Sequence, residues 1–215
     1  ELTLSGLIRA ADVTSIGGVR LDDDAITCLT DGVAGGLAYE VAIHPDADQN
    51  SENSTDALLS VLRPLADTAG IDVNIIPADG RRKRLLIADM DSTIITSESL
   101  DDMAVMAGLD DKVLPVTRRA MNGELDFTAA LDERIALFAG RPASLMSDAL
   151  AESSLSAGAQ TLVRTMKANG ARCYLISGGF TAITGPIAAA CGFDGHHANV
   201  LDMADNRLTG TVARP

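Results

Sequence analysis

The sequence is poor in aromatic residues: it contains no tryptophan, and phenylalanine and tyrosine together make up 3% of its 215 residues. A hydrophobic core must therefore be built mainly from aliphatic side chains and methionine, as layered α/β domains allow. Hydrophobic residues nevertheless account for 47% of the chain, which excludes an intrinsically disordered protein and predicts one or two globular domains.

Cysteine is also scarce, and long apolar runs are missing. Cys28, Cys173 and Cys191 are an odd number, are widely spaced and form no CxxC pair. This pattern argues against a disulfide framework or a zinc site and predicts a cytoplasmic location. Because there is no uninterrupted apolar span and no basic, apolar and small-residue series at the start, the sequence predicts neither a membrane-spanning helix nor a signal peptide.

Positive charge is in deficit, since the formal net charge is −13. A negative field of this size disfavours DNA, RNA and anionic membrane surfaces as partners. The basic cluster at residues 81–84 is short and precedes an apolar run. A solvated linker is favoured for it over a polyanion-binding patch.

Residues 1–80 predict a small α+β domain with strands and a helix over 55–69. A linker is expected at 78–84, where Asp79-Gly80 precedes the basic cluster. The apolar run 85–88 then predicts a strand of a parallel sheet, buried on both faces, that ends at Asp89.

The rest of the chain predicts helices followed by strand and helix alternation. Apolar spacing predicts the following helices: 98–107, 110–121, 127–139 and 144–151. A helix at 161–167, a buried strand at 172–176 and a helix at 180–190 are expected next. This order is typical of a βαβ unit, with the first four helices as an insert.

The segment DMDST places Asp89 and Asp91 directly after a predicted buried strand. Two neighbouring carboxylates repel each other unless a cation neutralises them, and hard oxygen ligands suit Mg²⁺, which often also binds a substrate phosphate. Asp89 is then a candidate nucleophile and Asp91 a candidate proton carrier. A calcium loop is excluded, because Ile94 and Leu100 stand where it needs Gly and Glu. Ordinary turn or capping aspartates remain the alternative for the pair taken alone.

The segment SGGF follows the second predicted strand and is expected to open a helix. The Ser177 hydroxyl and the backbone N–H of Gly178 could there converge on a phosphoryl group. The alternative is a tight strand-to-helix turn that uses glycine for its conformational freedom.

Together these motifs resemble the haloacid dehalogenase superfamily, specifically its phosphoserine phosphatases. The resemblance covers about residues 85–211 through the ordered segments DMDST, TSESLDDMA, TRRAMNGELDF, ALDER, LISGGF, ANVL and LTG. It implies a Rossmann-like parallel sheet core with an inserted helical cap, preceded by the α+β domain. The core would comprise 85–95 and 157–215 and the cap 96–156. An ACT-like regulatory domain that dimerises is one option for residues 1–80.

The resemblance also implies roles for individual residues. Asp89 would be the nucleophile and a Mg²⁺ ligand, while Asp91 would bind Mg²⁺ through its backbone carbonyl and transfer protons. Ser177 and Gly178 would hold the phosphoryl oxygens of O-phosphoserine.

Four further positions correspond to cap residues that recognise the amino-acid part of that substrate. Glu98 would pair with its ammonium group and Arg134 would grip its carboxylate. Met121 and Phe127 would wall the pocket. Without the resemblance, each is better explained as a core residue or a solvated charge.

The sequence departs from the family pattern after this point. The family's later Lys and its GDGxND motif are absent, since Lys167 is the last lysine, and Val200 replaces a residue that is often basic. We therefore expect a core truncated at its carboxyl end and an inactive chain. The alternatives are a phosphatase or phosphotransferase for another small phosphorylated alcohol, or a non-catalytic amino-acid-binding module.

Overall fold

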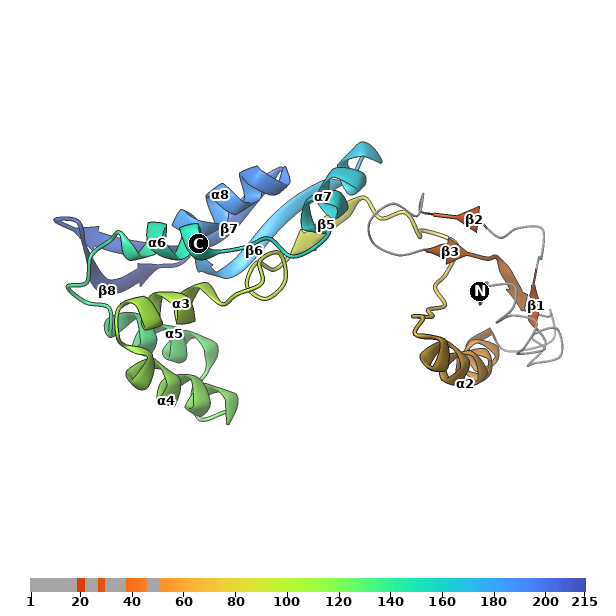
Figure 1. The fold of residues 1–215 in the computed structure, drawn as a ribbon, viewed down its shortest axis with the longest axis horizontal. Coiled ribbons are helices and arrows are strands. Elements are labelled where there is room, and N and C mark those ends of the chain that lie inside the picture. Colours follow the sequence, from red (N-terminus) through yellow and green to blue (C-terminus); the bar gives the residue numbers. More distant parts are fainter. Residues whose placement is uncertain (1–18, 22–26, 30–37, 46–50) are drawn as a thin grey trace. The chain divides into compact units, whose positions relative to one another are not determined.

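A computed structural model describes residues 19–21, 27–29, 38–45 and 51–215 (Figure 1). The chain divides into two compact units, Glu1–Arg81 and Arg82–Pro215. The division falls within the segment 78–84, for which the sequence predicts a linker. In the described part of the chain, no helix is long and apolar enough to cross a membrane.

The first unit contains short strand pairs and one long helix. Strand β1 (Val19–Leu21) pairs antiparallel with β4 (Ile43–Pro45), and β2 (Thr27–Cys28) pairs antiparallel with β3 (Tyr39–Glu40). Helix α2 (Ser51–Ala69) begins four residues before the predicted helix and ends where predicted. Leu58 of α2 is fully buried, and partly buried side chains pack around it: Val41, Ile43, Val61, Leu62, Leu65 and Ile75.

The second unit is built on a four-stranded mixed sheet with the order β5-β6-β7-β8. Its strands are β5 (Leu85–Ala88), β6 (Arg172–Phe180), β7 (Gly195–Ala204) and β8 (Arg207–Ala213). The first three are parallel and β8 is antiparallel to β7. Ala88 is in register with Leu175, so the residues after β5 lie beside the carboxyl end of β6.

The prediction that β5 is buried on both faces is wrong. Leu85 and Ile87 are 53% and 62% exposed, whereas Ala88 is buried. In the part of the chain that the structure describes, β5 is one of the two edge strands of the sheet. Because alternate side chains of a strand point to opposite faces of the sheet, Leu85 and Ile87 share one face, and that face is uncovered at β5.

The four predicted helices that follow β5 are confirmed to within three residues at their ends. They are α3 (Ser99–Met106), α4 (Asp110–Met121), α5 (Phe127–Ala136) and α6 (Leu145–Glu152). Helix α3 contacts α4 and α6, while α5 contacts both α4 and β8. The start of α5 is fixed by Asp126, whose side chain accepts a hydrogen bond from the N–H of Ala129 at 2.7 Å.

Two further helices and an antiparallel hairpin complete the second unit. Helices α7 (Ala159–Ala168) and α8 (Thr181–Cys191) follow in the predicted order. The antiparallel hairpin β7–β8 has no counterpart in the sequence prediction. Its turn is made by Asp205 and Asn206, which have φ of 50° and 60°. This left-handed pair suits a two-residue hairpin turn, and Asp-Asn was the local signal for it.

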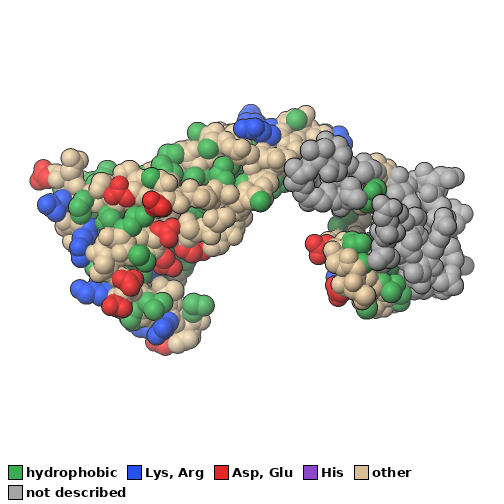
Figure 2. All heavy atoms as spheres, in the orientation of Figure 1, with side chains coloured by type: hydrophobic (Ala, Val, Ile, Leu, Met, Phe, Trp, Pro, Cys, Tyr) green, Lys and Arg blue, Asp and Glu red, His purple; other side chains and the backbone are tan. Residues whose placement is uncertain are grey.

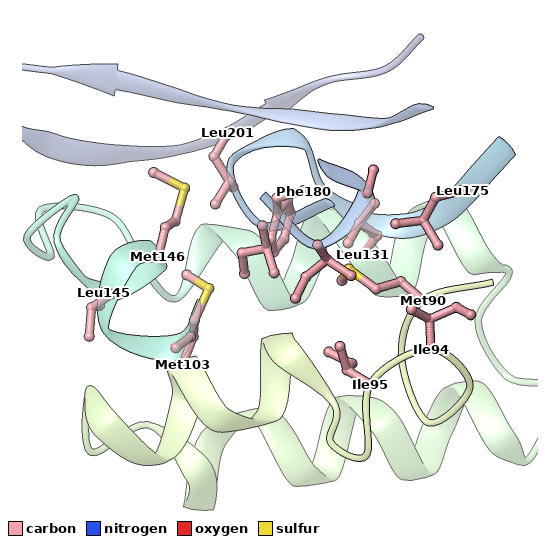
Figure 3. Close-up of a cluster of buried hydrophobic side chains, with 14 of the residues drawn as sticks. Met90, Ile94, Ile95, Met103, Leu131, Leu145, Met146, Leu175, Phe180 and Leu201 are labelled. Atoms are coloured by element: carbon pink, nitrogen blue, oxygen red, sulfur yellow. The ribbon is translucent and has the colours of Figure 1, made fainter. Parts of the chain in front are cut away.

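The core of the second unit lies between the sheet and the helices, as Figure 3 shows. It is mostly aliphatic and methionine-rich, with Met90, Met103 and Leu175 fully buried. Phe138 and Phe180 are the fully buried aromatic side chains among the described residues. The composition predicted such a core.

Asp194 joins the start of β6 to the end of α7. The N–H of Cys173 donates to its Oδ2 at 2.8 Å, and Lys167 Nζ lies 3.1 Å from its Oδ1. Chiefly the Cys173 hydrogen bond, and then the Lys167 ammonium, hold the pKa of Asp194 below its ordinary value of 3.8. The ionised form of this carboxylate therefore stabilises the fold.

We expect Asp194→Asn to lower the melting temperature near neutral pH. Because the folded-state pKa lies below the unfolded one, the stabilisation is complete above about pH 4 and is lost as the pH falls through the folded pKa. The difference between the two proteins should thus shrink as the pH is lowered below 3.8. Thermal unfolding at a series of pH values checks this, and a difference that does not change with pH would contradict it.

Candidate active site

The loop after β5 turns back sharply on itself. Met90 is fully buried, and its carbonyl accepts hydrogen bonds from the N–H groups of Thr93, Ile94 and Ile95 at 2.9 to 3.2 Å. Ser92 has the left-handed φ of 50°, which is uncommon for a residue with a side chain. Since alternate residues point to opposite sides, the burial of Met90 directs the flanking aspartates away from the core.

The two aspartates are held in different ways. Asp91 accepts at both carboxylate oxygens: Oδ1 from the N–H of Ser99 at 2.8 Å, and Oδ2 from the Ser177 hydroxyl at 3.2 Å. Asp89 accepts at Oδ1 from the N–H of Met90 at 2.7 Å, and its Oδ2 has no hydrogen-bond partner among the described residues. The Asp91 carboxylate is thus fixed, while Asp89 keeps one oxygen available for chemistry.

The segment SGGF forms the end of a strand and directly precedes a helix. Strand β6 continues to Phe180, and α8 begins at Thr181 with Phe180 as its N-cap residue. The prediction that the strand ends before SGGF is therefore wrong, whereas a helix does begin directly after this segment. The pairing with β7 shifts register between Ile176 and Phe180, and this irregularity lets the strand carry the two glycines past the end of β5.

The glycines make close contacts and do not adopt a left-handed backbone. Neither Gly178 nor Gly179 has a positive φ. A Cβ on Gly178 would lie 2.7 Å from Cζ of Phe127, and one on Gly179 would lie 3.1 Å from Ser177 Oγ and 3.3 Å from Asp91 Oδ2. The alternative explanation, a tight turn that needs glycine for its φ, is excluded by this geometry.

We expect Gly179→Ala to destabilise the fold by about 1–3 kcal/mol, because the added methyl group enters a packed region. Gly185→Ala is the matched control. Its Cβ would meet His196 at 3.4 Å, and the better helix propensity of alanine is offset by Pro186, which disfavours a Cβ on the helical residue before it, so we expect little net change. Urea unfolding of both variants checks the difference, and equal stability of the two would contradict the prediction.

A pocket of about 180 Å³ lies at the carboxyl edge of the sheet. It is lined by Asp89, Asp91, Glu98, Ser99, Leu100, Phe127, Leu131, Arg134, Gly178, Gly179 and Phe180. Six of the eight predicted site residues are in this set, and Ser177 adjoins it through its hydrogen bond to Asp91. Met121 is not in the set: it is the last residue of α4 and is 83% exposed. Met121 therefore does not form part of the pocket wall in this structure, and its role in substrate binding stays a prediction.

Three of the pocket residues that the sequence predicted come from the helical region. Glu98 precedes α3, and its Oε1 accepts a hydrogen bond from the Ser92 hydroxyl at 2.7 Å. Phe127 is the first residue of α5 and lies over Gly178. Arg134, two turns further along α5, donates from Nε to the Ala130 carbonyl at 3.2 Å. Its terminal nitrogens have no partner among the described residues, so they can form a forked contact with an anion.

Sequence reasoning missed several residues of the site. Ser92 orients Glu98, and the N–H of Ser99 holds Asp91. The Ser99 hydroxyl is buried without a partner in the described part of the chain. Leu100 and Leu131 form an apolar wall. The seryl residues stand within the quoted motifs, but their side-chain partners depend on the loop fold and could not be read from spacing.

The residues of this pocket suit a Mg²⁺ ion only in part. The described residues contain no group of three or more His, Cys, Asp or Glu side chains that could hold a metal. Mg²⁺ is commonly bound by one or two carboxylates together with water and substrate phosphate. Asp89 Oδ2 can supply one such carboxylate oxygen. Each Asp91 oxygen already accepts one hydrogen bond from the protein.

Charge around the pocket is mixed. Acidic side chains form a group on the face of the second unit that Figure 2 shows, with basic side chains around it. The chain as a whole has a net charge of −13, so an anionic ligand approaches against the average field. Arg134 supplies a positive charge within the pocket lining.

The fold and the site thus define an α/β protein with a carboxylate pair at the carboxyl edge of a parallel sheet. Residues 86–215 match the family model described as haloacid dehalogenase-like hydrolase, and the chain belongs to this family.

The proteins to which the chain is similar include phosphoserine phosphatases. One from Streptomyces coelicolor is 41% identical over 160 residues, which are 74% of this chain and 39% of that protein. One from Mycobacterium tuberculosis is 32% identical over 208 residues, 96% of this chain and 49% of that protein. A solved structure of a phospho-aspartyl intermediate analogue of phosphoserine phosphatase is 32% identical, covers 61% of this chain and 63% of its own, and has a TM-score of 0.57. The chain spans about half the length of these relatives.

Proposed function

We propose that the protein hydrolyses O-phosphoserine to serine and phosphate through a phospho-aspartate on Asp89. The observation that carries this proposal is the pocket itself. It places the partnerless oxygen of Asp89 together with an anchored Asp91, the carboxylate of Glu98 and the guanidinium of Arg134. The names of the similar proteins, including the phospho-aspartyl intermediate analogue, support the same reaction.

In the first step, an oxygen of Asp89 attacks phosphorus and the bond from phosphorus to the seryl oxygen breaks. Asp91, in its protonated form, gives its proton to the leaving oxygen. In the second step, Asp91 takes a proton from water, which attacks phosphorus and releases phosphate from Asp89. Splitting the displacement in this way replaces one difficult step by two easier ones. We expect the N–H of Gly178 to donate to a phosphoryl oxygen, and the Ser177 hydroxyl to turn from Asp91 Oδ2, 3.2 Å away, to donate to another when the phosphoryl group binds.

The other pocket residues recognise the serine part of the substrate. Glu98, oriented by Ser92, pairs with the ammonium group. The two terminal nitrogens of Arg134 bind the carboxylate. Phe127 and Leu131 wall the space between and limit the access of water. This division of charges favours an amino-acid substrate over a sugar phosphate.

We propose Mg²⁺ as the cofactor, held by the Asp89 carboxylate and the Asp91 backbone carbonyl. When bound, it neutralises charge on the phosphoryl group and on Asp89. Removal of divalent cations with EDTA should abolish turnover, and added Mg²⁺ should restore it.

The test of the function is phosphate release by the full-length protein from phosphoserine, phosphothreonine and a sugar phosphate. We expect phosphoserine to have the highest kcat/KM. Equal values for all three would remove the amino-acid assignment and favour a phosphatase for small phosphorylated alcohols in general. No phosphate release from any of them would favour the non-catalytic module.

For the first unit we propose an ACT-like module that binds an amino acid and pairs with a second copy. The match to the Mycobacterium tuberculosis protein supports a shared unit, because it extends over 96% of this chain. Serine titration by calorimetry and sedimentation of the full-length protein test the two parts separately. Absence of heat would count against the sensor, and a monomer would count against the pairing.

A further inference from the structure

Asn199 on β7 lies outside the pocket but is bonded to it. Its side chain is buried, with 7% of its surface exposed, and its Nδ2 donates to the Gly178 carbonyl at 2.8 Å. A carbonyl oxygen only accepts, so the amide side chain must present its NH₂ group there. A side chain that only fills the core would be aliphatic, whereas this buried amide makes one directed hydrogen bond to a carbonyl of β6.

The bonded carbonyl belongs to a peptide group with a second role. The Gly178 C=O and the Gly179 N–H form one planar unit, so fixing one fixes the direction of the other. On the opposite side of that unit, the Gly179 N–H donates to Ser177 Oγ at 2.8 Å. Glycine on both sides gives this peptide unusual freedom to rotate, because no side chain restricts it.

The Ser177 hydroxyl is the next link. As it accepts from the Gly179 N–H, its own proton is directed to Asp91 Oδ2 at 3.2 Å. Gly178 of the same segment packs closely against Phe127 of α5, since a Cβ on Gly178 would lie 2.7 Å from Cζ of Phe127. The hydrogen bonds thus run from Asn199 through one peptide plane to Ser177 and Asp91.

We propose that Asn199 is a positioning residue that sets the 178–179 peptide and, through it, the Ser177 hydroxyl for phosphoryl binding. This inference rests on the proposed function for its kinetic consequence. Where the peptide is free to rotate, the Gly179 N–H leaves Ser177 and the hydroxyl loses its fixed direction. Asn199 touches neither substrate nor reacting atoms.

The experiment compares Asn199→Asp and Asn199→Ala with Thr184→Val in the full-length protein. Aspartate has the shape of asparagine, but its carboxylate cannot donate to the carbonyl. Thr184 is buried and hydrogen-bonded to His196 at 2.8 Å, so its variant also loses a side-chain bond beside β7 but away from the pocket. The readouts are kcat and KM for phosphoserine, the Kd of inorganic phosphate, and the NMR shift and hydrogen exchange of the Gly179 amide.

We expect both Asn199 variants to lower kcat/KM by about 10- to 100-fold, to raise the phosphate Kd, and to speed exchange of the Gly179 amide. Thr184→Val should leave all three readouts within about twofold of wild type, even if its melting temperature falls as much as those of the Asn199 variants. An unchanged Gly179 amide and phosphate Kd in both Asn199 variants would overturn the proposal. If wild type does not turn over phosphoserine, the proposed function fails, and the amide and phosphate readouts still decide the role of Asn199.

Discussion

Replacing Asp89 by asparagine is expected to lower kcat for phosphoserine by about 10³-fold or more in the full-length protein. An amide is a poor nucleophile, and it carries no negative charge for a cation. The side-chain oxygen of asparagine can accept the same hydrogen bond from the Met90 N–H that Asp89 Oδ1 accepts, so the loop should remain folded. Loss of turnover would then report on chemistry and not on stability.

Asp202→Asn is the matched control for this change. Asp202 lies on β7 and accepts from Thr211 Oγ1 of the same hairpin at 2.7 Å. Its variant should retain activity. Circular dichroism and melting temperatures of both variants establish that each is folded, and initial rates of phosphate release measure the effect. Undiminished turnover by folded Asp89→Asn would end the proposed mechanism.

Replacing Arg134 by methionine is expected to lower kcat/KM for phosphoserine by about 10²- to 10³-fold. Methionine keeps an unbranched apolar stem in place of that of arginine, but the forked contact with the substrate carboxylate is lost. Because Nε is bonded to the Ala130 carbonyl of its own helix, the guanidinium is held in direction before substrate binds. The effect should therefore appear mainly in KM.

A substrate without a carboxylate provides the specificity readout. Phosphoethanolamine should be a poor substrate for wild type, and Arg134→Met should change its kcat/KM by less than about threefold. Arg119→Met is the control variant, since Arg119 pairs with Glu133 at 2.7 Å on the exposed surface. An equal loss for both substrates in Arg134→Met would show that Arg134 acts on the fold or the phosphate and not on the carboxylate.

The helices of the second unit were predictable because their signals are local. Apolar spacing predicted α4 over Asp110–Met121 without error. The hairpin β7–β8 was not predicted, because its short Asp-Asn turn was not recognised. The extension of β6 through SGGF was also missed, since a bulge depends on the strand beside it.

The candidate site was predictable to the level of motifs. Both aspartates, Gly178 and Arg134 line one pocket, as the ordered segments implied. Met121 does not, because α4 ends with that side chain in solvent. Asn199 stands in the segment ANVL, but its hydrogen-bond partner could not be read from the sequence, because the Gly178 carbonyl lies 21 residues away.

By itself, the sequence determined the aliphatic core, the helical periods and the positions of the two aspartates and the glycine pair, because these follow from side-chain chemistry and near neighbours. Only the tertiary structure decided which oxygen of Asp89 stays without a partner and that Ser177 reaches Asp91 across 86 residues. It also decided that β5 leaves Ile87 uncovered. Such outcomes depend on strand register and loop packing. These bring together residues that are far apart in the sequence and that no periodic pattern links.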